Sequence, residues 1–249
     1  MVKITFLGTA SAVPSKDQHN THLIFESDSH VVMVDCGGNP IVRLGQAGID
    51  PLTITDLILT HFHPDHVSGL PLLLMDMWLM GRNNKLVIYG LEDVLDRAKQ
   101  MMALFDWQDW DGFYPLEFHP LNGPSEMTLV ETDRLTLTAS PVCHMIPGIG
   151  IKLIFPEGAI CYSSDTGPCE DLIDLAKGAD ILIHEASGEF HGHTSPAQAG
   201  MIATQAGVGT LYLIHYPPNS HNETMVKQAK MNFSGKVIVA EDLMTVTLQ

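Results

Sequence analysis

The chain has 249 residues, of which 45% are apolar, so it can bury a sizeable core, and we expect a single domain over residues 1–249. Its 13 basic and 29 acidic residues give a formal net charge of −16, a field that repels polyanions. Because no Lys/Arg cluster suited to phosphate contacts along a groove is present, nucleic acid is a disfavoured partner.

Cysteine content and the main apolar run indicate the cellular setting. The four cysteines form no CxxC pair, and the N-terminal residues show no secretory pattern. Reduced thiols are the simplest interpretation, so we expect a cytoplasmic protein. The apolar run at 70–80 is too short to span a bilayer and contains Asp76, so no membrane association is expected.

Strand-like and helix-like patterns alternate along the chain. The first half predicts strands at 2–7, 22–26, 30–35, 56–60 and 86–89, a helix at 91–105, and strands at 128–132 and 135–140. The second half predicts strands at 149–155 and 159–163, a helix at 169–177, a strand at 180–184, a helix at 195–206 and a strand at 210–215. An antiparallel opening followed by this alternation favours two face-to-face sheets with helices outside over one parallel sheet.

The strongest chemical signal is His61-Phe-His-Pro-Asp-His66, which follows an apolar strand. Residues two apart in an extended segment project to one side, so His61 and His63 can present imidazoles to one ion. Pro64 keeps His63 extended and turns the chain, which lets Asp65 and His66 face a second ion. Three imidazoles and a carboxylate within six residues therefore predict a metal site.

Three further candidate ligands follow in the chain. His144 comes after the strand at 135–140, Asp165 lies within Ser163-Ser-Asp-Thr-Gly167, and His215 ends the strand at 210–215. Together with the HxHxDH motif at 61–66, they resemble the ligand motifs of the metallo-β-lactamase superfamily over essentially the whole chain. The resemblance implies the α/β fold of that superfamily, an αββα sandwich of two mixed sheets with helices on the outer faces and the ligand loops along one edge.

The resemblance also implies two divalent metal ions bridged by Asp165. The first ion would be held by His61, His63 and His144, and the second by Asp65, His66 and His215. Imidazole and carboxylate ligands favour Zn²⁺ and also suit Mn²⁺ or Fe²⁺. A hydroxide bridging the metals would be the nucleophile, since bound metal lowers the pKa of water from 15.7 to about 7, and Asp65 would orient it. The metals, carboxylates and hydroxide sum to about +1, which favours a small anionic or ester substrate.

Other segments resemble ribonuclease Z, namely those at 6–16, 35–37, 184–187 and 192–195. The last implies that His193 is the general acid for the leaving group; alternatively, residues 193–195 only cap the following helix. His184 either orients a ligand, with Glu185 as its partner, or belongs to a buried structural pair.

The departures from ribonuclease Z bear on the substrate. The bacterial and archaeal enzymes carry a long arm between the motifs of His144 and Asp165 that clamps transfer RNA, whereas about twenty residues separate these positions here, enough for two strands and a turn. His19 and an extra residue also replace an Arg-Asn pair of the opening loop. Together with the acidic net charge, these features make transfer RNA processing a less favoured hypothesis than an activity on small molecules.

We therefore hypothesise a metal-dependent hydrolase that acts as a phosphodiesterase on small phosphate diesters such as cyclic nucleotides. One alternative is a lactonase, arylsulfatase or thioester hydrolase on the same site, in which the hydroxyl of Tyr216 would polarise a carbonyl. Others are a ribonuclease Z-like tRNA 3′ endonuclease and a non-catalytic binding module that has lost its metals.

The remaining features predict structure. The apolar run at 70–80 either packs in the core or forms a homodimer contact, as the corresponding region does in ribonuclease Z relatives. Histidines outside the ligand motifs are expected on the surface or in loops; they are His19, His22, His30, His119, His191 and His221.

Overall fold

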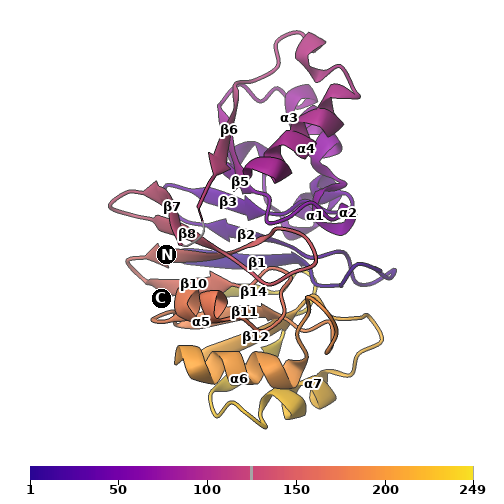
Figure 1. The fold of residues 1–249 in the computed structure, drawn as a ribbon. Coiled ribbons are helices and arrows are strands. Elements are labelled where there is room, and N and C mark those ends of the chain that lie inside the picture. The colour runs from indigo at the N-terminus through magenta and orange to yellow at the C-terminus, as the bar shows by residue number, and fades with distance from the viewer. Residues whose placement is uncertain (124–125, 249) are drawn as a thin grey trace.

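Two mixed sheets pack face to face in the computed structural model, which describes residues 1–123 and 126–248 (Figure 1). The first sheet runs in the order β14 (Thr245–Leu248), β1 (Val2–Gly8), β2 (His22–Glu26), β3 (Val31–Val34), β4 (Asp56–Ile58), β5 (Leu86–Leu91) and β6 (Leu116–Leu121). The second runs in the order β13 (Lys236–Val239), β12 (Thr210–Ile214), β11 (Ile181–Glu185), β10 (Gly158–Tyr162), β9 (Ile149–Phe155), β8 (Thr136–Pro141) and β7 (Met127–Glu131).

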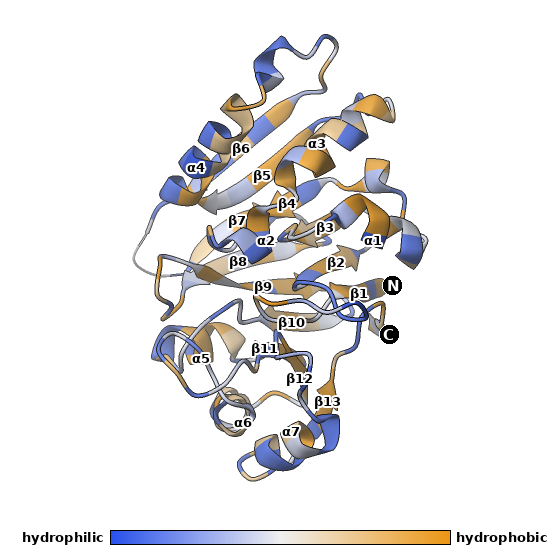
Figure 2. Cartoon of the chain, turned by 90° about the vertical axis from the view of Figure 1, so that its right-hand side faces the viewer, coloured by the Kyte–Doolittle hydropathy of each residue, from blue (hydrophilic) through white to orange (hydrophobic). Residues whose placement is uncertain are grey.

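Helices cover the outer face of each sheet (Figure 1). The first sheet carries α1 (Pro40–Ala47), α3 (Leu70–Leu79) and α4 (Glu92–Ala103), with the short α2 (Pro64–Val67) at its edge; the second carries α5 (Glu170–Ala176), α6 (Pro196–Ala206) and α7 (Asn222–Ala229). Figure 2 shows hydrophilic and hydrophobic residues side by side on α4 and α7, as expected for helices with one buried face. The predicted αββα sandwich is confirmed.

Strand alternation divides the core into three layers. On β2, Leu23 and Phe25 pack between the two sheets, while Ile24 points to the helices over the first sheet. A third apolar cluster lies between the second sheet and α5 to α7. Because apolar side chains fill these layers, the polar ligand candidates collect where the strands end.

Parallel pairing brings those strand ends to one edge. In the first sheet β3, β4 and β5 are parallel neighbours, and in the second β10, β11 and β12 are. The carboxyl ends of parallel strands meet at the same edge of a sheet, so the loops after β3, β4, β10, β11 and β12 converge.

The predicted strands and helices agree with these elements to within a few residues, but several elements were not predicted. The helix α1 is one of them, although its signals are in the sequence. The Asn39 side chain accepts a hydrogen bond from the Val42 amide at 3.2 Å, Pro40 occupies the first turn, and Gly48 ends the helix at φ 70°.

The apolar run at 70–80 forms α3 and the residue after it. Its inner side is core, since Leu70, Leu73, Leu74 and Met77 are buried, whereas Leu79 is 66% exposed. The core interpretation holds for that side, and a homodimer contact through the outer side stays a prediction. Within the described ranges, no helix combines the length and apolar character needed to cross a membrane.

The prediction that the unassigned histidines lie at the surface is wrong for His22. This side chain is 1% exposed, and its Nδ1 lies 2.9 Å from the carbonyl oxygen of Asn20. Burial lowers its pKa to about 4, so the imidazole is neutral. The reason is register: His22 alternates with Leu23 on β2 and therefore points to the helix side of the sheet.

Candidate metal centre

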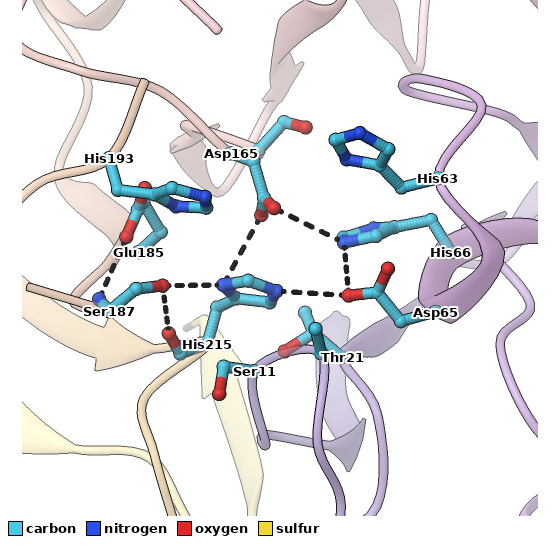
Figure 3. A network of polar contacts seen from close by, with 12 residues as sticks. Ser11, Thr21, His63, Asp65, His66, Asp165, Glu185, Ser187, His193 and His215 are labelled. Atoms are coloured by element: carbon cyan, nitrogen blue, oxygen red, sulfur yellow. Dashed lines mark hydrogen bonds and ion pairs between the residues drawn. The ribbon is translucent and has the colours of Figure 1, made fainter. Parts of the chain in front are cut away.

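Seven side chains from four segments of the chain converge at the shared edge of the two sheets. Figure 3 shows His63, Asp65, His66, Asp165 and His215 among them. The segment after β4 contributes His61 and His63 from its loop and Asp65 and His66 from α2, and the loops after β8, β10 and β12 contribute His144, Asp165 and His215. The two groups of ligand atoms each lie within 4.8 Å and share Asp165. All seven predicted ligand candidates are thus brought together, in the two sets expected.

The first group surrounds His63. Its Nδ1 lies 3.1 Å from Nε2 of His61 and 3.1 Å from Nε2 of His144. Nitrogens bound tetrahedrally at about 2.0–2.1 Å from a zinc ion stand roughly 3.3 Å apart, so both distances from His63 are close to the spacing of two ligands on one zinc ion.

The second group forms around His66. Its Nε2 lies 3.4 Å from Oδ2 of Asp65 and 3.5 Å from Oδ2 of Asp165, and Nε2 of His215 lies 3.4 Å from the same Asp65 oxygen. Oδ2 of Asp165 is also 3.8 Å from Nε2 of His61 in the first group. That one oxygen therefore stands between both groups, the position of a bridging ligand.

A buried aspartate sets the tautomers of two ligand imidazoles. Asp35 is fully buried and accepts hydrogen bonds from the Thr60 amide and hydroxyl, each at 2.9 Å, and from Nδ1 of His66 at 2.8 Å. Because the Thr60 hydroxyl donates to Asp35, its oxygen accepts from Nδ1 of His61 at 3.0 Å. Both rings carry their proton on Nδ1 and leave Nε2 free for a metal.

The ligands from the second sheet are oriented in the same way. Nδ1 of His144 donates to the carbonyl oxygen of Gly192 at 2.8 Å. The Ser187 hydroxyl donates to the carbonyl oxygen of His215 and so accepts from Nδ1 of that residue, both at 2.8 Å (Figure 3). Neither Ser187 nor Asp35 was predicted as a site residue, since each acts on a partner distant in sequence.

Buried polar atoms without partners show that a cation fits here. Among the described residues, nothing forms a hydrogen bond with Nε2 of His66 or Oδ1 of Asp165, although both side chains are at most 2% exposed. Such atoms are costly unless they coordinate a metal. Burial raises the pKa of Asp165, but His215 and His66 outweigh it and hold the pKa well below its usual range, so the carboxylate is ionised.

Backbone strain also gathers at this edge. Asp35, Ser164 and His215 adopt left-handed conformations, with φ of 59°, 54° and 51°. Such conformations cost non-glycine residues on the order of 1–3 kcal/mol each and persist where the surrounding structure enforces them. Each strained residue either belongs to the proposed ligand set or directly precedes or orients a member of it.

His193 lies beside both groups and has its own carboxylate partner. Its Nδ1 donates to Oε1 of Glu185 at 2.7 Å, and its ring centroid is 4.9 Å from His144 and 6.0 Å from His215. Burial lowers the pKa of His193, but the hydrogen bond and charge of Glu185 outweigh it, so the pKa is raised. Capping of α6 is performed instead by Ser195, through a capping box with Gln198.

The geometry bears on two open hypotheses. His184 is buried and its Nδ1 bonds the backbone oxygen of Glu185, which favours the buried structural alternative, whereas the Glu185 carboxylate accepts a hydrogen bond from His193. The Tyr216 hydroxyl donates to the carbonyl oxygen of Ala240 at 2.7 Å in the core beneath α6 and α7, so it does not face the candidate metal atoms.

We expect Asp35→Asn to weaken metal affinity about 10- to 100-fold, because the substitution removes the charge that orients His66. Chelator competition followed by zinc analysis measures this effect. Asp56→Asn is the matched control, since Asp56 is also buried and pairs with a histidine, His30, but at the other end of β4. Equal zinc affinity in both variants would contradict the role assigned to Asp35.

Fold and site together define a protein with the metallo-β-lactamase fold whose side chains are placed to hold metal ions. Residues 2–238 match the family model described as Anti-Pycsar protein Apyc1, and the chain belongs to this family.

Curated relatives and solved structures resemble the chain over its length. Ribonuclease Z of Methanothermobacter thermautotrophicus is 29% identical, over 100% of this chain and 97% of its own. Uncharacterized protein Rv1339 of Mycobacterium tuberculosis is 31% identical over 95% of this chain and 88% of its own length. The metallo-β-lactamase fold protein YhfI of Bacillus subtilis superimposes with a TM-score of 0.84 at 23% identity, covering 98% of each chain. Human tRNase Z, short form, superimposes with a TM-score of 0.81 at 24% identity, and the match covers 99% of each chain.

Proposed function

We propose that the protein is a small-molecule phosphodiesterase that holds two divalent metal ions, with Zn²⁺ as the preferred ion. The proposed ligands are His61, His63 and His144 for one ion, Asp65, His66 and His215 for the other, and Asp165 between them. When bound, such a pair of ions supplies an activated water as nucleophile and draws charge from the phosphoryl oxygens. The observation that carries the proposal is the His193–Glu185 pair beside both ligand groups.

His193 is placed to act as the general acid. Because Nδ1 donates to Glu185, the second ring proton of the imidazolium is on Nε2 and is available to a leaving oxygen. Protonation of that oxygen lets an unactivated alcohol depart from phosphorus. Burial raises the pKa of Asp65, but the neighbouring imidazoles of His215 and His66 outweigh it and hold the pKa below its usual range, so the carboxylate stays ionised and can orient the attacking water.

The geometry favours a phosphate diester over a carbonyl ester. The side chain suggested as the donor to the developing oxyanion of a lactone or thioester, Tyr216, is bonded to Ala240 instead, so the observation that favoured a carbonyl ester is lost. Phosphodiester cleavage also agrees with the similarity to ribonuclease Z, a protein named for acting on RNA.

A small substrate is favoured over transfer RNA. The chain between His144 and Asp165 is taken up by β9 and β10, the two strands and turn expected from its length, so no arm emerges there. The ribonuclease Z alignment spans 309 positions against the 249 residues of this chain, so that relative carries segments with no counterpart here. The net charge of −16 opposes a polyanion as well.

A substrate panel tests the proposal. The metal-loaded protein is assayed with zinc and with manganese on bis(4-nitrophenyl) phosphate, a cyclic nucleotide, a phosphomonoester, an aryl sulfate, a lactone and a precursor transfer RNA. We expect turnover of the two small phosphodiesters to exceed that of every other substrate, precursor transfer RNA included. Lactone or sulfate ester turnover without phosphodiester cleavage would refute the proposed function.

We expect Glu185→Gln to move the alkaline limb of the kcat profile to lower pH. His193 must be protonated to donate, and Glu185 raises its pKa; activity therefore falls as pH rises through that raised pKa, and removing the charge brings the fall to lower pH. The profile is measured with Glu189→Gln, an exposed glutamate of the same loop, as control. An unchanged alkaline limb would show that Glu185 does not raise the pKa of the general acid.

A further inference from the structure

Two large apolar side chains stand exposed beside the proposed general acid. Phe190 is 55% exposed and its ring centroid lies 4.5 Å from that of His193, at 41° between the ring planes. Met145 is 52% exposed and directly follows His144. Exposed apolar side chains next to a polar site are typical of ligand contacts, although single ones are also common elsewhere on protein surfaces.

The backbone fixes both side chains in this position. The Phe190 amide donates to the carbonyl oxygen of Gly188 at 3.2 Å, and the His193 amide donates to that of Phe190 at 3.0 Å, which makes a tight turn. Gly192, at φ 76°, brings this turn against Met145, since a Cβ there would lie 3.0 Å from the Met145 amide nitrogen. The exposed ring therefore belongs to a packed turn that also carries His193.

The position of the leaving group indicates which part of the substrate lies against Phe190 and Met145. The alcohol that leaves phosphorus must lie beside the acid that protonates it, and any group attached to that alcohol then extends over the neighbouring side chains. Phe190 and Met145 are among these neighbours, and their side chains offer no charge and no hydrogen bond to a ligand. An aromatic ring beside a polarisable thioether suits a flat aromatic group better than a charged or aliphatic one.

We propose that Phe190, together with Met145, determines specificity by packing against a planar aromatic ring, such as a nucleobase or an aryl group, that is attached to the leaving alcohol of the phosphodiester. This inference rests on the proposed function. It narrows the substrate class to diesters whose leaving alcohol carries such a ring.

The test separates ring recognition from phosphate recognition. Wild type, Phe190→Ala and Phe190→Trp are compared by competitive inhibition with AMP and with inorganic phosphate, using bis(4-nitrophenyl) phosphate as substrate. We expect Phe190→Ala to raise the inhibition constant of AMP by roughly tenfold, the size of one base–aromatic stacking contact, and to leave that of phosphate unchanged. Phe190→Trp should retain AMP binding.

Phe105→Ala is the matched control, since Phe105 is 53% exposed but follows α4, away from the ligand loops. Equal changes for AMP and phosphate, or no change for either, would overturn the proposal. Calorimetric titration with AMP provides a readout independent of turnover. If wild type cleaves no phosphodiester, the proposed function fails, whereas AMP binding that Phe190→Ala still weakens would support the aromatic contact.

Discussion

Replacing Asp165 with Asn should lower kcat/KM by at least about 1000-fold, the largest loss expected for a single carboxylate in this protein. Asp165 is a member of both ligand groups, and its Oδ2 lies 3.8 Å from Nε2 of His61 and 3.5 Å from Nε2 of His66. An amide in its place cannot neutralise two cations, and several kcal/mol of charge stabilisation correspond to about three powers of ten in rate.

The same variant should bind fewer than two metal ions per chain, which elemental analysis measures beside the kinetics. Asp96→Asn is the control, because Asp96 lies on α4 with its side chain 57% exposed and only a surface pair to Lys99. Circular dichroism shows whether the variant keeps its secondary structure. A folded Asp165→Asn protein with full metal content and near-normal activity would contradict the bridging role.

Replacing His193 with Ala should lower kcat about 100- to 10,000-fold on substrates with poor leaving groups while leaving the metal content intact. His193 lies next to the ligand groups without completing either of the two sets that share Asp165. The loss follows from removing the proton donor. It should be much smaller for 4-nitrophenyl esters, because 4-nitrophenolate departs without protonation.

His191→Ala is the control for this second prediction, since His191 is exposed two residues away on the same turn. Rates are measured over a series of leaving groups of differing basicity. Equal losses across the series would show that His193 does not donate the proton, and loss of metal would show that it acts as a ligand.

Local patterns and the family resemblance were sufficient to name the seven residues that the structure brings together, and to predict most of the fold. The HxHxDH segment places four ligand candidates within six residues, and the strands before Asp165 and His215 are largely apolar, whereas the strand before His144 mixes apolar residues with Thr and Ser. Parallel strand ends then bring these positions together, as αββα topology requires.

Residues that orient the ligands could not be predicted from local patterns. Asp35 and His66 meet across 31 positions, and Ser187 and His215 across 28, through the neighbouring ends of different strands. Only the pairing order of the sheets brings them into contact. Asp35-Cys-Gly37 and His184-Glu-Ala-Ser187 were singled out by resemblance, but neither Asp35 nor Ser187 received a role.

The wrong prediction for His22 and the undecided one for residues 70–80 also have local causes. His22 occupies a β-run whose two faces are both buried, one by the second sheet and one by the helices, so the rule that a lone histidine lies outside fails there. The run at 70–80 is apolar on nearly every side, so periodicity could not separate its core face from Leu79 and Met80.

The most direct test of the account is anomalous X-ray diffraction at the zinc edge from crystals of the zinc-loaded protein. The account predicts two peaks roughly 3.5–4 Å apart. One should lie among His61, His63 and His144, the other among Asp65, His66 and His215, with Asp165 between them. A single peak, no peak, or zinc bound elsewhere would contradict the dinuclear centre.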